Sequence, residues 1–401
     1  MFTPLLLAHY TATSCLGSGL GATLAALRAN RSGLARCQFE DVTLPTCCGA
    51  VAGLDRVALP AALARFDCRN HRLALHGLQQ DGFLDAVAAA RQRYGAQRIG
   101  VFLGTSTSGI LETEHVYRQR GADGALPAGF DYASTHSLYA LAEFVRRLCA
   151  LGGPAAVVST ACSSSAKVYA SAARLIHAGV IDAAIVGGVD SLCLTTLYGF
   201  NSLELLAEAP CRPFDRGRDG ISIGEAAAFA LLERATATDA TAVLLCGVGE
   251  SSDAHHMSSP HPQGLGAQQA MQAALASAGC TPAEVDYINL HGTATPSNDE
   301  AEARAVRALF GSALPPASST KGATGHTLGA AGALEAVICA LALREGLVPA
   351  STGTRAADPA LGLQPPLAPF AAPLRRVLSN SFGFGGTNAS LLFARAGDCA
   401  S

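Results

Sequence analysis

The segment VVSTACSSSAKVYASAARLIHAG, residues 157–179, joins a short run of β-branched residues to an alanine-rich stretch with helical spacing. This pattern predicts a strand that turns directly into a helix. Cys162 lies at the turn, among small residues. The free amides of a helix N-terminus carry about half a positive charge, so a thiol placed there is expected to have a low pKa and to be a good nucleophile. The alternative is that Cys162 is one more small buried residue among 13 cysteines.

Strand-like and helical segments alternate along the rest of the chain, which predicts an α/β fold built in layers. The expected strands lie within 98–109, 155–162, 183–192, 226–233, 241–251, 281–295 and 375–394, and those at 226–233 and 241–251 look like neighbours. The expected helices lie within 163–178, 266–279, 299–311 and 329–346.

A weak internal symmetry suggests two similar halves. Each half holds a strand, a polar turn with a reactive residue and a helix, with Cys162 in the first half and His291 in the second. The polar stretch ERATATDAT lies between the halves. We therefore expect one unit over 1–240 and another over 241–401.

Composition narrows the class of protein. The 401 residues are 49% hydrophobic and 15% charged, and the net charge is −3, which gives no support for nucleic-acid binding. No apolar run reaches the length of about 18 residues that a membrane span needs, and the amino terminus lacks the features of a secretion signal. The cysteines are scattered, so we expect neither a disulfide framework nor a metal site, and a reducing cytoplasm is the expected location.

Three further stretches carry side chains suited to chemistry: HGTATPSND at 291–299, KGATGHTLGAAG at 321–332 and NSFGFGGTNAS at 380–390. Taken singly, each could be a polar turn or a helix cap. Together they supply two histidines in glycine-flanked turns and a lysine. With a cysteine at a helix start, these are the parts of a thiol acyl-transfer site. The two histidines lie on different turns without metal-ligand spacing, so no metal is expected.

With TACSSS at 160–165, these motifs make the whole chain resemble a β-ketoacyl-[acyl carrier protein] synthase, a condensing enzyme of types I and II. The resemblance implies a thiolase-type fold with two similar αβαβα halves in five layers. It implies no bound cofactor, because phosphopantetheine arrives on an acyl carrier protein. It also implies a homodimer, or a heterodimer with a chain-length-factor-like homologue.

The resemblance also implies a role for each motif residue. Cys162 would take the acyl chain, and neutral His291 and His326 would promote decarboxylation of malonyl-carrier protein, with Lys321 setting the second of these histidines. The backbone amides of Cys162 and Phe384 would form an oxyanion hole, and Phe384 would be a gate. The remaining implied roles are pantetheine binding by Thr293 and Thr295 and a structural acid at Glu302. In this interpretation Cys162 is a thiolate near neutral pH without a base in direct contact.

Two further expectations concern surfaces that the substrate would meet. Arg65, Arg69 and Arg72 have helical spacing, and we expect them to form one basic face that docks the acidic carrier protein. The segment 103–115 matches the floor of the acyl tunnel. Its small residues Thr105 and Ser106 would leave room for long or unsaturated chains, although their hydroxyl groups could instead satisfy local backbone groups.

Departures from the usual motifs, such as Asn298 before Asp299 and Lys167 after the serines, resemble a specialised branch such as aryl polyene synthesis. Other classes stay open. A thiolase would carry a second cysteine where Phe384 stands, and a starter-unit synthase would have a Cys–His–Asn set. A non-catalytic chain-length subunit would lack the cysteine.

Overall fold

The computed structural model describes residues 2–235, 239–311 and 314–399. One continuous hydrogen-bonded sheet forms its centre, and it divides into two five-stranded halves, here called the first and the second sheet, where β1 and β10 pair at Leu5–Leu245 and Leu6–Leu244. The first sheet has the order β6 (Ala155–Val158), β5 (Ile99–Gly104), β7 (Ala183–Asp190), β9 (Ala226–Arg234) and β1 (Leu5–Ser14). The second has the order β12 (Ala317–Ser318), β11 (Tyr287–Asn289), β15 (Arg376–Phe382), β16 (Thr387–Arg395) and β10 (Val243–Ser252).

The two sheets repeat one topology. In each, the first three strands are parallel and the last two pairings are antiparallel. This repeat confirms the internal symmetry but corrects two details. The edge strand β6, which precedes Cys162, corresponds to β12, so the counterpart of the Cys162 turn holds Lys321 rather than His291. The segments 226–233 and 241–251 are not neighbours, because β1 lies between β9 and β10.

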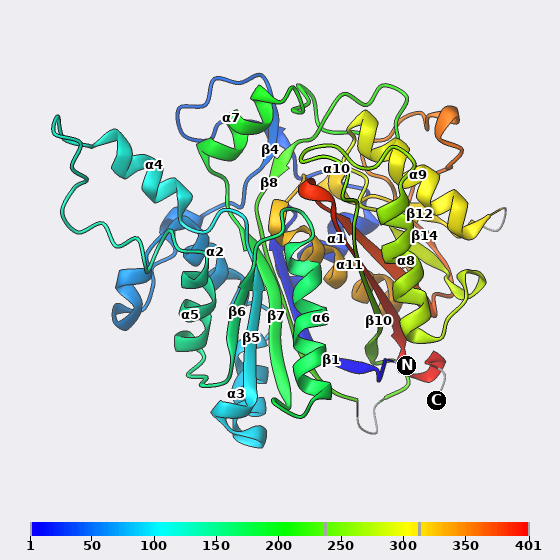
Figure 1. The fold of residues 1–401 in the computed structure, drawn as a ribbon, viewed down its shortest axis with the longest axis horizontal. Helices are drawn as coiled ribbons and strands as arrows, with labels where there is room; N and C mark the ends of the chain where they lie inside the picture. Colours follow the sequence, from blue (N-terminus) through cyan, green and yellow to red (C-terminus); the bar gives the residue numbers. More distant parts are fainter. Residues whose placement is uncertain (1, 236–238, 312–313, 400–401) are drawn as a thin grey trace.

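Helices fill the space between the sheets and cover both outer faces, which gives five layers (Figure 1). The central layer consists of α6 (Ser164–His177) and α11 (Ala331–Glu345). One outer layer consists of α2 (Arg69–Leu78), α3 (Phe83–Tyr94) and α5 (Tyr139–Leu148), and the other of α8 (Leu265–Ala278) and α9 (Pro296–Phe310). These helices and strands confirm the segments expected from the sequence, and this layered α/β arrangement is the thiolase-type fold.

Burial explains why α11 is apolar all round. It lies between both sheets, and every residue from Ala331 to Leu343 is buried. A helix that is hydrophobic on all sides is expected to be enclosed. Glu335 is therefore a charge placed inside the molecule, and it needs a partner there.

The remaining elements lie at the edges of this core. They are α1 (Gly19–Arg28), α4 (Ile110–Arg118), α7 (Leu194–Ser202), α10 (Lys321–Thr324) and the short strands β2 (Gly17–Ser18), β3 (Ala35–Arg36), β4 (Cys47–Gly49), β8 (Ile223–Gly224), β13 (Leu347–Val348) and β14 (Phe370–Ala371). Helix α4 and the chain after it project from one end of the molecule (Figure 1). Among the described residues, no helix combines the length and the apolar character needed to cross a bilayer.

Candidate active site

Cys162 lies in the turn between β6 and α6, as the sequence predicts, and its side chain is buried. The preceding Ala161 has a left-handed backbone with φ of 52°, which costs energy for a residue with a Cβ atom. Such strain is common at functional turns. The Cys162 side chain lines a cavity together with His291, His326 and Phe384.

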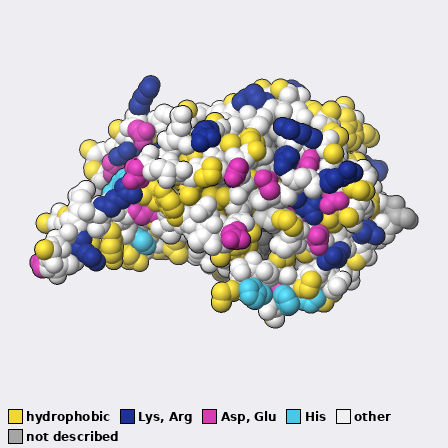
Figure 2. Space-filling model, turned by 90° about the horizontal axis from the view of Figure 1, so that it is seen from above, with side chains coloured by type: hydrophobic (Ala, Val, Ile, Leu, Met, Phe, Trp, Pro, Cys, Tyr) yellow, Lys and Arg dark blue, Asp and Glu magenta, His cyan; other side chains and the backbone are white. Residues whose placement is uncertain are grey.

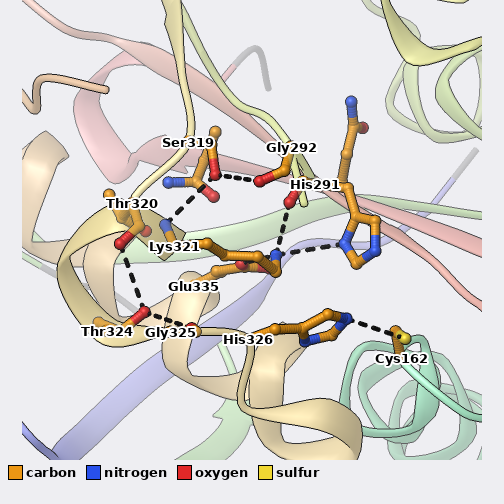
Figure 3. A network of polar contacts seen from close by, with 12 residues as sticks. Cys162, His291, Gly292, Ser319, Thr320, Lys321, Thr324, Gly325, His326 and Glu335 are labelled. Carbon is orange, nitrogen blue, oxygen red and sulfur yellow. Dashed lines mark hydrogen bonds and ion pairs between the residues drawn. The ribbon is translucent and has the colours of Figure 1, made fainter. Parts of the chain in front are cut away.

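The expected ionisation of Cys162 is wrong for the resting structure. Burial raises the pKa of the thiol to about 11, although Lys321 and the backbone N–H of Phe384 act in the opposite direction. The free-energy cost of removing a thiolate from water is larger than the stabilisation that these two partners provide. Cys162 also has a nitrogen neighbour: Nε2 of His326 lies 3.1 Å from its Sγ atom (Figure 3).

The hydrogen bonds of His326 fix its tautomer. Its Nδ1 accepts the backbone N–H of Leu328 at 3.1 Å, so the ring proton lies on Nε2. Burial, with Lys321 nearby, holds the pKa of His326 well below its usual value, and the ring is neutral. His326 therefore directs an N–H donor at Cys162.

Lys321 contacts the first histidine, His291, and not the second one as expected. The Lys321 ammonium donates to the His291 carbonyl at 2.6 Å, faces His291 Nδ1 at 3.3 Å and forms a buried ion pair with Glu335 (Figure 3). With Nδ1 facing an ammonium, the ring proton of His291 lies on Nε2. Burial lowers the pKa of His291 well below its usual value. The two rings lie edge to face, with centroids 5.3 Å apart, so two neutral N–H donors occupy one site.

The turn that carries His291 rests on two buried carboxylates from α9. Glu302 accepts the backbone N–H groups of His291 at 2.8 Å and Gly292 at 2.7 Å. Burial raises the pKa of Glu302 to about 7. Asp299 accepts the N–H of Ala294 at 3.2 Å. These bonds fix the backbone of the turn, and neither carboxylate lines the cavity around Cys162.

Thr293 and Thr295 follow His291 and also line the cavity. Their hydroxyl oxygens lie 2.9 Å apart. Both side chains are buried at the cavity wall, where hydroxyl groups can donate to a polar ligand. This places the expected pantetheine-binding pair beside the histidines.

Phe384 also lines the cavity, in the turn between β15 and β16. Its ring contacts that of Phe200 on α7, with centroids 5.7 Å apart. The next two residues, Gly385 and Gly386, have φ of 78° and 74°, a backbone that L side chains rarely adopt. A Cβ on Gly386 would also lie 2.8 Å from Cβ of Asp253, so glycine is required there.

The expected basic docking face does not form as one helix face. Arg65 lies in a 3-10 turn (Ala61–Phe66), whereas Arg69 and Arg72 belong to α2. Arg69 is turned inward, donating to both carboxylate oxygens of Glu225, which has no exposed side-chain surface. Arg65 and Arg72 are more exposed and pair with Asp131 and Asp67.

The segment expected to floor the acyl tunnel is tied to a buried carboxylate. Asp190 accepts the hydroxyl of Thr105 at 2.7 Å and the backbone N–H groups of Ser106, Thr107 and Gly329. Neither Thr105 nor Ser106 lines the cavity around Cys162. For Thr105, these bonds favour the alternative in which the hydroxyl group stabilises the local fold instead of lining an acyl tunnel.

The sequence analysis missed three buried carboxylates: Asp190, Glu225 and Glu335. Each is a single charge next to or within an apolar run, at the end of β7, at the start of β9 and inside α11. That signal was available in the sequence, since an isolated charge in an apolar run requires a buried partner.

The fold brings together metal-ligand types that the sequence keeps apart. The sulfur of Cys162 and one nitrogen each from His291 and His326 lie within 4.8 Å of one another, the only such three-donor set found among the described residues. Spacing along the sequence does not predict this cluster, because its three side chains come from three separate turns. The same atoms form the acyl-transfer site.

Comparisons with known proteins agree with this geometry. Residues 68–238 match the family described as "Beta-ketoacyl synthase, N-terminal domain", and residues 242–355 match "Beta-ketoacyl synthase, C-terminal domain". Nodulation protein E of Rhizobium meliloti strain 1021 is 38% identical over 74% of this chain and 76% of its own. The 3-oxoacyl-[acyl-carrier-protein] synthase 2 of Vibrio cholerae is 32% identical over 95% of this chain and 96% of its own.

Two solved structures are also similar. The ketosynthase ApeO of Xenorhabdus doucetiae, in complex with its chain length factor ApeC, is 39% identical with a TM-score of 0.87, covering 98% of both chains. The ishigamide ketosynthase/chain length factor is 27% identical with a TM-score of 0.88, covering 98% of this chain and 99% of that one. The chain belongs to the β-ketoacyl synthase family, the condensing enzymes of fatty acid and polyketide synthesis.

Proposed function

We propose that Cys162 accepts an acyl chain from the phosphopantetheine of an acyl carrier protein and that His291 and His326 drive its extension by a malonyl unit. One observation carries this proposal: two neutral histidines with protonated Nε2 atoms share one cavity with a cysteine. Such donors suit a reaction in which negative charge develops on a thioester oxygen.

In the loading step, the Cys162 sulfur bonds to the thioester carbonyl carbon and the bond from that carbon to the pantetheine sulfur breaks. The cysteine proton ends on the departing pantetheine thiol. The backbone N–H groups of Cys162 and Phe384 hold the carbonyl oxygen as it becomes negative. The raised pKa of Cys162 means that the thiol stays protonated until a thioester arrives.

In the extension step, His291 and His326 donate their Nε2 protons as hydrogen bonds to the carbonyl oxygen of the malonyl thioester. The bond to the carboxylate breaks and carbon dioxide leaves, while its electron pair forms an enolate. The enolate carbon then attacks the acyl carbonyl on Cys162, the bond from that carbonyl carbon to the Cys162 sulfur breaks, and the leaving thiolate takes a proton from water. Lys321 acts through His291, because it faces Nδ1 of that ring and does not itself line the cavity.

Phe384 is proposed to open this site. The cavity has a volume of about 50 Å³, which is room for a few water molecules but not for an acylated pantetheine arm. Rotation of Phe384 away from Phe200 would enlarge it, and the glycines at 385 and 386 permit that movement. Thr293 and Thr295 would then hold the pantetheine.

The resemblance to condensing enzymes also suggests the partners of this protein. An acyl carrier protein supplies the phosphopantetheine, and Arg65 and Arg72 are the more exposed parts of the proposed docking region. A second copy or a chain-length-factor-like homologue would cover β6, an edge strand whose four residues are all half-buried. The exposed Tyr117 and Tyr139 flank the projecting segment that follows α4. Figure 2 shows hydrophobic side chains at this extended end of the molecule, where a partner could cover them.

The similarity to ApeO supports the aryl polyene branch rather than housekeeping fatty acid synthesis. We also propose a cytoplasmic location and a boundary between the two halves near residue 240. The pocket walls Phe200, Leu205 and Ile221 are apolar and would contact the acyl chain.

The test is a loading and extension assay. The protein, together with its partner if one is required, is mixed with an acylated carrier protein, and intact-mass spectrometry identifies an acyl adduct on Cys162. Addition of malonyl-carrier protein should give the β-ketoacyl product. The variant Cys162→Ala should lose both signals, whereas Cys149→Ala, a buried cysteine of the outer core, should keep them. Elongation by Cys162→Ala would contradict the assignment.

A further inference from the structure

Cys246 and Cys399, both at the second sheet, lie in contact although they are 153 residues apart in the sequence. The Sγ atoms of Cys246 and Cys399 lie 2.9 Å from each other. Cys246 belongs to β10, at the irregularity where the pairing with β16 shifts between Leu245 and Gly247. Cys399 follows a short turn after β16.

The turn that carries Cys399 is fixed by its backbone. The N–H of Ala396 donates to the carbonyl of Ala242 at 2.8 Å, and the N–H of Gly397 donates to that of Ala240 at 3.0 Å. Arg376 donates to the carbonyl of Asp398 at 2.7 Å. Cys399 is therefore held over Cys246 by the fold.

The thiol pair is open to small reagents. It lines a cavity of about 440 Å³, and Cys280 and Arg376 line the same cavity. Cys399 is half-buried. One S–H···S hydrogen bond joins the two thiols, and this bond, with Arg376 nearby, lowers the pKa of Cys399 and raises that of Cys246.

We propose that Cys246 and Cys399 form a reversible disulfide when the protein meets hydrogen peroxide. The Cys399 thiolate attacks one peroxide oxygen, the O–O bond breaks, and a sulfenic acid and hydroxide form. Cys246 then attacks the sulfenic sulfur, the S–O bond breaks and water leaves. In sum, two thiols and one peroxide give one disulfide and two waters. The bond would tie the segment after β16 to β10.

The test uses the full-length protein with and without hydrogen peroxide, followed by alkylation and cleavage after glutamate. This cleavage puts the three cavity cysteines on separate peptides, 234–250, 251–284 and 346–401. We expect peptides 234–250 and 346–401 to be joined in most molecules, with loss of two hydrogen atoms, and to separate after dithiothreitol.

Matched variants decide the assignment. Cys280→Ser should form the same linked peptides, and Cys246→Ser should not. Free thiols at Cys246 and Cys399 after peroxide treatment of folded protein would overturn the proposal. A link from Cys399 to Cys280 in place of Cys246 would also overturn it, as would direct oxidation of Cys399 to a sulfonic acid that dithiothreitol cannot reverse.

Discussion

Replacing Arg69 with glutamine should destabilise the protein rather than weaken docking alone. Glu225 has no exposed side-chain surface, and Arg69 donates to its two oxygens at 2.6 Å and 2.9 Å. The backbone N–H groups of Val51 and Leu192 also donate to this carboxylate, at 2.8 Å and 2.9 Å, and they cannot neutralise it. Breaking a buried pair of this kind costs about 3–5 kcal/mol.

Arg65→Gln is the matched control. The Arg65 and Asp131 side chains are 56% and 35% exposed, so their ion pair is screened by water. Its loss should cost about 0–1 kcal/mol. The unfolding free energy of both variants is measured by urea denaturation at one protein concentration, and activity is measured with a carrier-bound and a small thioester substrate.

Arg69→Gln should lose activity on both substrates in equal proportion, because the change acts through the fold. Equal stability of the two variants would refute the argument from burial. A loss confined to the KM for the carrier substrate would restore Arg69 to the docking surface.

The remaining predictions concern the site itself. Cys162→Gln should stop elongation but leave malonyl decarboxylation, since both histidines keep their donors; carbon dioxide release measures this, and its absence would separate the histidines from that step. In Glu302→Gln an amide N–H₂ replaces one of the two oxygens that accept the N–H groups of His291 and Gly292, which should cost about 1–3 kcal/mol by denaturation. Burial raises the pKa of Glu302 from 4.5 to about 7. Between these two pH values the native state therefore binds more protons than the unfolded state. This group's contribution to stability is therefore full below the unfolded pKa near 4.5 and falls by up to about 1.4 kcal/mol per pH unit as the pH rises to about 7. The variant should lack that slope, and an unchanged slope would assign it to another group. Ser106→Phe should shorten the products, as judged by mass spectrometry, if the acyl tunnel passes this residue. Thr105→Val should instead lower stability by about 1–3 kcal/mol through its lost bond to Asp190, with product lengths unchanged.

Local patterns in the sequence were sufficient for most helices and strands and for the turns that carry Cys162, His291, His326 and Phe384. The turn before α6 and the apolar stretch of α11 have periodicities that depend only on neighbouring residues. The glycine-flanked motifs around His291, His326 and Phe384 could be found for the same reason, since a turn requires its residues at fixed positions.

The tertiary structure decided how those residues are paired and charged. Spacing alone made Arg69 look like a surface cation, but the fold places Glu225 against it. The helix position of Cys162 suggested a thiolate, but burial between two sheets raises its pKa. Glu335 forms its ion pair only because the fold packs α11 beside Lys321. Periodicity is a property of consecutive residues, whereas desolvation and ion pairing depend on distances between segments that are remote in the sequence, so only the folded chain determines them.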